Sequence, residues 1–96
     1  MYKIIIFGTG LYGKQALQFF TRENVMFWTD NKEDLHGKLI EGIEVIPPSE
    51  LKKYLNECVI VIAAKPEFFN QIKYQLNKEY GIEMALNYTF LKSYIN

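Results

Sequence analysis

The run Lys3-Ile-Ile-Ile-Phe-Gly-Thr-Gly-Leu-Tyr-Gly-Lys14 decides the fold of this chain. Tyr2 to Phe7 shows no alternation of polar and apolar residues, which is the pattern of a strand buried on both faces. Three glycines follow at once, and apolar residues then recur at helical spacing, at Gly13, Ala16, Leu17 and Phe20. We therefore expect a buried strand, a tight glycine turn and a helix packed against the sheet.

Each glycine of this turn has a separate expected role. Gly8 permits the sharp turn off the strand, Gly10 lets a pyrophosphate approach the backbone, and Gly13 lets the helix press closely on the sheet. The free N–H groups and the dipole at the helix start favour a bound phosphate. The sequence thus predicts a phosphate-binding turn formed by Gly8, Thr9, Gly10, Leu11, Tyr12 and Gly13. A structural turn without a ligand is the alternative.

Polar residues near this turn extend the predicted site. Lys14, in the first helical turn, is expected to place a positive charge near the phosphate. The alternative is a solvated surface side chain. Asp30 lies seventeen positions after Gly13, at the end of the expected strand 25–29. A carboxylate there accepts hydrogen bonds from a ribose and repels a 2′-phosphate, so NADP is disfavoured. Asn31 is expected to contact a ribose or a base edge. Capping of local N–H groups by Asp30 is the alternative.

A third contribution is expected from Ala63, Ala64 and Lys65, which follow the most apolar strand of the chain, Cys58 to Ala63. In a doubly wound sheet this strand ends beside the first strand, where ligands bind. The two alanines either leave room for a ligand or simply pack closely.

The remaining segments predict an alternating order of strands and helices. Asn31 to Gly37 is expected as a loop, 37–46 as an irregular ribbon ending in a strand at 44–46, and Pro48 as the start of a short helix. Pro66 begins a longer helix that Gly81 caps, followed by a strand at 82–86 and a short helical tail. This order predicts one three-layer α/β domain over residues 1–96, Rossmann-like, with a five-stranded parallel sheet in the order 3-2-1-4-5.

Composition excludes several classes of function. The 96 residues carry eleven basic and eleven acidic side chains without a basic stripe, so we expect no nucleic-acid partner. No apolar run is long enough to span a membrane and no secretory signal is seen, which favours a cytoplasmic location and no membrane partner. The single Cys58 is expected to be buried, and the single His36 to be a solvated loop residue. Neither provides a metal cluster.

Four stretches carry a resemblance to a known family. They are residues 3–14, Trp28-Thr-Asp-Asn31, the ribbon Gly37-Lys-Leu-Ile-Glu-Gly-Ile-Glu-Val-Ile-Pro47, and Val59-Ile-Val-Ile-Ala-Ala64. Together they resemble the nucleotide-binding domain at the N-terminus of bacterial nucleotide-sugar acyltransferases, with relatives in glycosyltransferases, sugar methyltransferases and polysaccharide-biosynthesis proteins. The resemblance implies binding of a UDP-linked sugar or NAD. Tyr12 stands where the acyltransferases often have a histidine, and their catalytic body is absent from these residues.

No convincing catalytic group is found. Tyr74-x-x-x-Lys78 and Tyr88-x-x-x-Lys92 match a dehydrogenase spacing, but tyrosines and lysines are numerous here. We therefore expect a nucleotide-binding module, not catalytic on its own, with a fused or associated catalytic domain as in a sugar-modifying transferase. The alternatives are the NAD-binding half of an oxidoreductase, a ligand-sensing domain and a partner-binding domain. The aromatic tail is expected to pack on its own sheet, although it also suits a homodimer contact.

Overall fold

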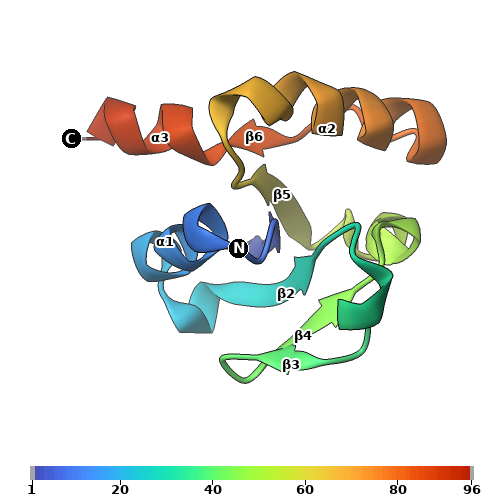
Figure 1. Ribbon diagram of the computed structural model, residues 1–96, viewed down its shortest axis with the longest axis horizontal. Helices are drawn as coiled ribbons and strands as arrows, with labels where there is room; N and C mark the ends of the chain where they lie inside the picture. The colour runs from blue at the N-terminus through green and yellow to red at the C-terminus, as the bar shows by residue number, and fades with distance from the viewer. Residues whose placement is uncertain (1, 96) are drawn as a thin grey trace.

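The computed structural model describes residues 2–95, except for the side chain of Ile95. Strands and helices alternate along most of the chain (Figure 1). The strands are β1 (Lys3–Phe7), β2 (Val25–Thr29), β3 (Leu39–Ile40), β4 (Ile43–Ile46), β5 (Cys58–Ile62) and β6 (Leu86–Asn87). The α-helices are α1 (Leu11–Phe20), α2 (Pro66–Tyr80) and α3 (Tyr88–Ile95), and short 3₁₀ helices cover Arg22–Asn24, Glu33–Leu35 and Pro48–Tyr54.

The six strands form one mixed sheet in the order β3-β4-β2-β1-β5-β6. All neighbouring pairs are parallel except β3 and β4, which are antiparallel. The predicted five-stranded, all-parallel sheet in the order 3-2-1-4-5 was therefore wrong in strand count and order. The reason lies in the ribbon 37–46, where Glu41 and Gly42 adopt positive φ angles and turn the chain back on itself. The ribbon thereby adds a short antiparallel strand at the sheet margin.

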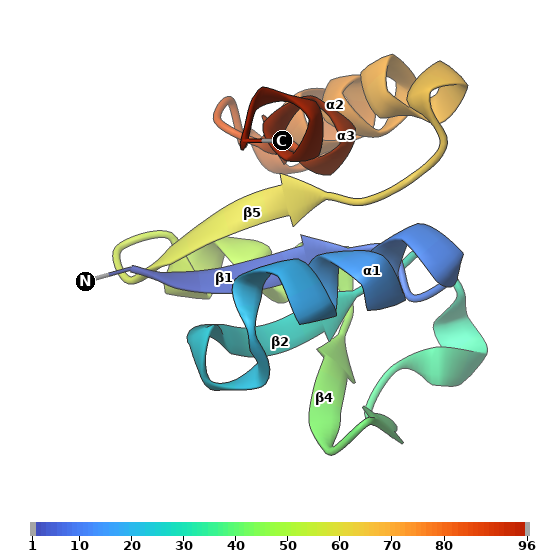
Figure 2. The ribbon, with the colours of Figure 1, turned by 90° about the vertical axis from the view of Figure 1, so that its left-hand side faces the viewer.

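Two apolar clusters cover the two faces of the sheet. One includes Ile5 and Ile60 of the sheet and lies under Leu51 of the 3₁₀ helix 48–54 and Leu76 of α2. The other joins Ile6, Val61 and Trp28 of the sheet to Ala16 and Leu17 of α1, and to Tyr88 of α3. Figure 2 shows α1 lying along β1 and β2. The arrangement has three layers, with β1 at its centre between β2 and β5.

The C-terminal part of the sheet departs from the prediction. Gly81 ends α2 in the left-handed conformation, and the N–H of Ile82 bonds the carbonyl of Leu76 at 3.0 Å. This helix cap occupies the first residue of the expected strand 82–86. Strand pairing with β5 consequently begins only at Leu86.

The aromatic tail divides between core and surface. Tyr88 is buried against α1, with its ring 5.7 Å from that of Phe19, as expected for packing on the domain's own sheet. Phe90 and Tyr94 instead stack on each other, with ring centroids 5.8 Å apart, and are exposed.

Within residues 2–95, no helix has the length and apolar character that a membrane crossing requires.

The turn between β1 and α1 is shaped by two close backbone approaches. Gly8 has a φ of +119°, and a β-carbon there would stand 2.4 Å from the carbonyl oxygen of Ala63. A β-carbon at Gly13 would stand 1.9 Å from the carbonyl oxygen of Gly8 and 3.2 Å from the Trp28 ring. Only residues without a side chain fit both positions, as predicted for the turn and the close helix packing.

We expect Gly13→Ala to lower the free energy of unfolding by at least about 2 kcal/mol, because the added methyl overlaps backbone that cannot move aside. Gly10→Ala is the matched control, since no atom lies within 4 Å of a β-carbon built there. It should change stability by less than about 0.5 kcal/mol. Urea unfolding followed by the fluorescence of Trp28, the sole tryptophan, measures both. Equal stability of the two variants would contradict the close approach.

Candidate nucleotide-binding cleft

A cleft of about 480 Å³ lies at the carboxyl ends of β1, β2 and β5. It brings together residues from three separate parts of the sequence, which is the arrangement expected where neighbouring parallel strands end. The predicted residues that line it are Gly8, Thr9, Gly10, Leu11, Tyr12, Asp30, Asn31, Ala63, Ala64 and Lys65. Gly13 and Lys14 do not line it: Gly13 is a buried residue of α1 that faces the sheet, and Lys14 is an exposed side chain of that helix.

The start of α1 opens into this cleft. In the part of the chain that the structure describes, the backbone N–H groups of Leu11, Tyr12 and Gly13 have no hydrogen-bond acceptor, as is usual in a first helical turn. Gly10 faces open space and Leu11 is 71% exposed. The side chains of the described residues therefore leave the N-terminal amides of α1 uncovered, at the position where the helix dipole favours an anion.

Asp30 ties the glycine turn to the end of β2. Its Oδ2 accepts hydrogen bonds from the Thr9 N–H at 3.0 Å and from the Thr9 hydroxyl at 2.8 Å. Its Oδ1 accepts from the Lys32 N–H at 3.1 Å. The Thr9 amide is thus occupied and contributes nothing to a phosphate. Since a carboxylate has about four acceptor sites in total, these three bonds leave one lone pair free, on Oδ1.

The end of β5 is packed closely at one residue and open at the next two. Ala63 is 3% exposed, and its carbonyl lies directly against Gly8. Ala64 is half-buried and Lys65 is exposed at the start of α2. Ala63 is therefore closely packed, while Ala64 and Lys65 line the cleft at positions where a ligand is still a prediction.

Four residues of the cleft were not predicted from the sequence as site residues: Phe7, Lys32, Phe68 and Ile72. Phe68 is 45% exposed in the first turn of α2, where a solvent-facing aromatic is an available signal. Ile72 gives no such signal, because its spacing of four from Leu76 also fits a core-facing position of the helix. Phe68, Ile72 and Leu11 together give the cleft an apolar part beside the polar Asp30 and Lys32 that also line it.

His36 is not the solvated loop residue that was predicted. It is half-buried, and its Nε2 lies 2.7 Å from the backbone carbonyl oxygen of Asp30. The loop 31–37 curls into a 3₁₀ turn at Glu33–Leu35 and brings the imidazole back to the end of β2. His36 therefore supports the residue that holds the glycine turn.

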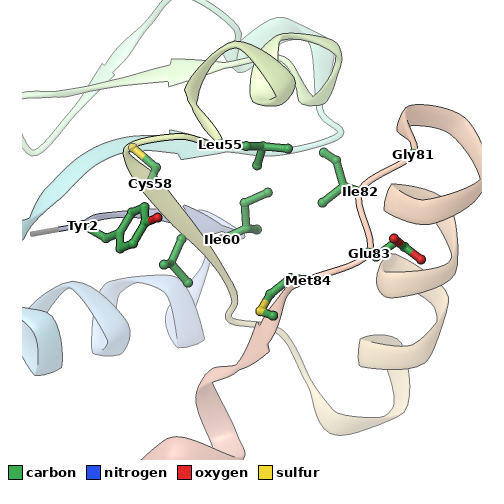
Figure 3. A pocket seen from close by; sticks show the side chains of 9 residues that line it. Tyr2, Leu55, Cys58, Ile60, Gly81, Ile82, Glu83 and Met84 are labelled. Atoms are coloured by element: carbon green, nitrogen blue, oxygen red, sulfur yellow. The ribbon is translucent and has the colours of Figure 1, made fainter.

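A second, apolar cleft of about 310 Å³ lies away from this site, at the start of β5 (Figure 3). Cys58 stands at one end of it with Tyr2, and Met84 stands at the other. Cys58 is 3% exposed. Burial, and then the negative charge of Glu57, raise the pKa of its thiol. The thiol is accordingly a weak nucleophile at neutral pH.

Neither tyrosine of the two Tyr-x-x-x-Lys pairs lines the cleft. Tyr88 is buried in the core and its pKa is raised by that burial, while Tyr74 is 66% exposed on α2 outside the cleft. Among residues 2–95 no three histidine, cysteine or acidic side chains are grouped so as to hold a metal ion.

We expect the Cys58 thiol of the folded protein to react with a disulfide reagent at pH 7 at least about tenfold more slowly than that of the urea-unfolded chain. Because the pKa of the Cys58 thiol is raised, its thiolate fraction, and with it the reaction rate, should still increase at pH values where the rate of an ordinary thiol no longer changes. Cys58 is the only cysteine, so Cys58→Ser gives the blank. Equal rates in the folded and unfolded chains would show that the thiol is accessible.

Comparisons with known proteins place this chain in a described family and fold. The family model described as C2185-like, N-terminal, matches residues 1–85. No curated protein matches the chain. A solved structure with the same fold is UDP-D-quinovosamine 4-dehydrogenase from Vibrio fischeri, with a TM-score of 0.63 and 17% identity. The match covers 90% of this chain and 76% of that one.

The Rex-family repressor RSP also shares the fold in three structures: alone, with beta-NADH, and with beta-NAD+ and operator DNA. Their TM-scores are 0.62, 0.61 and 0.63, at 17%, 18% and 17% identity. Each match covers 98% of this chain. The chain spans only 54–59% of the length of the repressor chains.

The expectation that nucleic acid is excluded as a partner was wrong. A protein of the same fold, the Rex-family repressor, was solved bound to operator DNA. The balanced net charge of this chain was not sufficient to exclude a nucleic-acid partner. Net charge affects non-specific binding, but it does not determine which specific partners a protein of a given fold has.

Proposed function

Because the chain belongs to the C2185-like N-terminal family, we propose that it is a nucleotide-binding module whose glycine turn holds a diphosphate. The observation that carries this proposal is the open mouth of α1. Three N–H groups there, on Leu11, Tyr12 and Gly13, lack acceptors within residues 2–95, and the neighbouring Gly10 leaves free space for an anion. The mouth also adjoins the central strand, where ligands of open α/β sheets bind.

The ligand of this proposal is NAD(H) or a UDP-linked sugar, both of which contain a diphosphate joined to a ribose. Asp30 lies beside the turn and has acceptor capacity left for a ribose hydroxyl. Its charge disfavours NADP, which carries a 2′-phosphate at that hydroxyl. Structures of the same fold support the ligand class, since the repressor was solved with beta-NAD+ and with beta-NADH. The dehydrogenase is named for a UDP-sugar.

The module is proposed to serve a larger sugar- or polysaccharide-modifying protein, such as a transferase. The sequence resemblance supports this context. Within the cleft lining, the Thr9 hydroxyl donates a hydrogen bond to Asp30 that holds the glycine turn, and we assign it this structural role. Chemistry on the ligand is therefore assigned to a fused or associated catalytic domain.

A ligand-sensing role is a second candidate. The observation in its favour is the repressor, a regulatory protein of this fold that was solved with both redox forms of the nicotinamide cofactor. A sensor is expected to bind NAD+ and NADH with different affinities, whereas a module that only anchors a diphosphate is expected to bind them equally. Calorimetric titration with the two cofactors separates these roles.

We expect Gly10→Val to abolish ligand binding while the fold persists, because the valine side chain fills the space of the phosphate and its β-carbon has no protein atom within 4 Å. Thermal-shift screening with UDP, UDP-N-acetylglucosamine, NAD, NADH, NADP and CoA provides the measurement. A ligand at one hundred times its dissociation constant adds about 2.7 kcal/mol of stability to the wild type. Without ligand, the variant should unfold within about 1 kcal/mol of the wild type. A ligand that stabilises both proteins equally binds elsewhere.

We expect Asp30→Ala to weaken the binding of ribose-containing ligands. Because Asp30 also holds Thr9, the sharper readout is the affinity ratio of ADP to 2′-deoxy-ADP. This ratio should be about tenfold in the wild type, the range expected of one hydrogen bond to a charged group, and close to one in Asp30→Ala. Thr9→Val, which leaves the carboxylate in place, should keep the ratio. An unchanged ratio in Asp30→Ala would remove Asp30 from the ribose site.

A further inference from the structure

The outer edge of β5 is only partly paired. On its inner side, β5 pairs with β1 at every residue from Cys58 to Ile62. On its outer side, within residues 2–95, it pairs with β6 only at Val61 and Ile62. The apolar cleft of about 310 Å³ lies where the outer pairing is missing, between the first half of β5 and the segment 81–84 (Figure 3). We call this opening in the sheet the wedge and the segment 83–85 the strap.

A buried backbone group of β5 points into the wedge without a partner. The N–H of Lys3 donates to the carbonyl of Glu57, and the N–H of Ala63 donates to the carbonyl of Phe7, each at 2.9 Å. Because backbone groups alternate sides along a strand, Ile60 directs its own groups away from β1. The N–H of Ile60 has no acceptor among the described residues, although this residue is only 1% exposed. Buried N–H groups without an acceptor are rare, so this one indicates a second arrangement in which it is bonded.

The strap carries the backbone groups that match this edge. Continuing the register of β5 and β6 backwards places Met84 opposite Val59 and Ala85 opposite Ile60. In such a parallel ladder, the N–H of Met84 donates to the carbonyl of Cys58, and the carbonyl of Met84 accepts from the N–H of Ile60. Within residues 2–95, the N–H of Met84 also has no acceptor in the open wedge. The two edges of the wedge are therefore complementary to each other.

The side chains already lie on the faces that this pairing requires. Ile60 and Ala85, which become neighbours in the continued register, belong to the same apolar cluster on the α2 face of the sheet. A register shifted by one residue would place Ala85 on the opposite face. The strap therefore reaches the paired arrangement without turning any core side chain to the other face.

Two fixed points limit the movement to the strap itself. The N–H of Ile82 donates to the carbonyl of Leu76 at 3.0 Å in the cap of α2, and the Ile82 side chain is 2% exposed in the core. At the other end, Leu86 is fixed by its pairing with β5. Between them, Glu83 and Met84 are exposed. Rotation of the backbone at these two residues is sufficient to swing the strap towards β5.

We propose that the strap is a closing device, which moves between the open wedge and a closed state in which β6 extends over residues 84–87. Closure forms two backbone hydrogen bonds, satisfies the buried N–H of Ile60 and shuts the apolar cleft. It costs the conformational freedom of the strap, which keeps the open state accessible. The closed state also covers a sheet edge that is otherwise available to a strand of another molecule.

Relaxation-dispersion NMR of the isotope-labelled chain without ligand measures this movement. We expect exchange on the microsecond-to-millisecond timescale at the amides of Ile60 and Met84. In Met84→Pro, which lacks the N–H that closure needs, the exchange contribution at Ile60 should fall at least about threefold. Met84→Ala is the matched control, because it also loses the thioether but keeps both backbone groups. Its exchange contribution at Ile60 should stay within about one third of the wild-type value.

Xenon gives a second measurement on the unchanged sequence, because it enters apolar cavities. Xenon pressure should hold the wedge open and also lower the exchange contribution at Ile60 at least about threefold. Flat dispersion profiles at Ile60 and Met84 of the wild type would overturn the proposal, and so would an Ile60 profile that persists unchanged in folded Met84→Pro. If Met84→Pro does not fold, an Ile60 profile that xenon leaves unchanged overturns it. No nucleotide is added, so the result is independent of the proposed function.

Discussion

The close approach of α1 to the end of β1 is the constraint on which the rest of the structure depends. Gly13 lets the helix lie against the carbonyl of Gly8, and Gly8 in turn lets the end of β5 lie against the turn. These two contacts bring β1, β5 and the start of α1 together without side chains between them. The helix therefore begins at the centre of the sheet with its first N–H groups facing solvent, which is where an anionic ligand gains most from them.

Asp30 connects this constraint to the second half of the site. Its carboxylate fixes Thr9, and its backbone carbonyl is bonded by His36. The glycine turn is thus held from β2 as well as from β1, although it contains three glycines and would otherwise be mobile. The arrangement uses the Thr9 amide for structure and leaves the later amides for a ligand. Preorganisation of this kind lowers the cost of binding.

The sequence predicted those features that depend on residues close together in the chain. The buried strand, the glycine turn and the helix follow from one run of twelve residues, and the positions of Asp30 and Ala63 follow from the general layout of alternating strands and helices. Contacts between distant residues were not predictable. Asn31 and Gln75 are 44 positions apart, and neither shows a local pattern that indicates a partner. The short β3 and the late start of β6 depend on the Glu41-Gly42 turn and the Gly81 cap, whose geometry overrides strand-forming composition.

The central claim, that the free amides of α1 bind a diphosphate, is tested most directly by nuclear magnetic resonance. The measurement is the change in backbone amide shifts of the isotope-labelled chain during titration with ADP. We predict the largest shifts at Gly10, Leu11, Tyr12 and Gly13, together with slowed hydrogen exchange of the last three amides. Shifts confined to the apolar cleft around Tyr2 and Met84, or no shifts at saturating ADP, would contradict the claim.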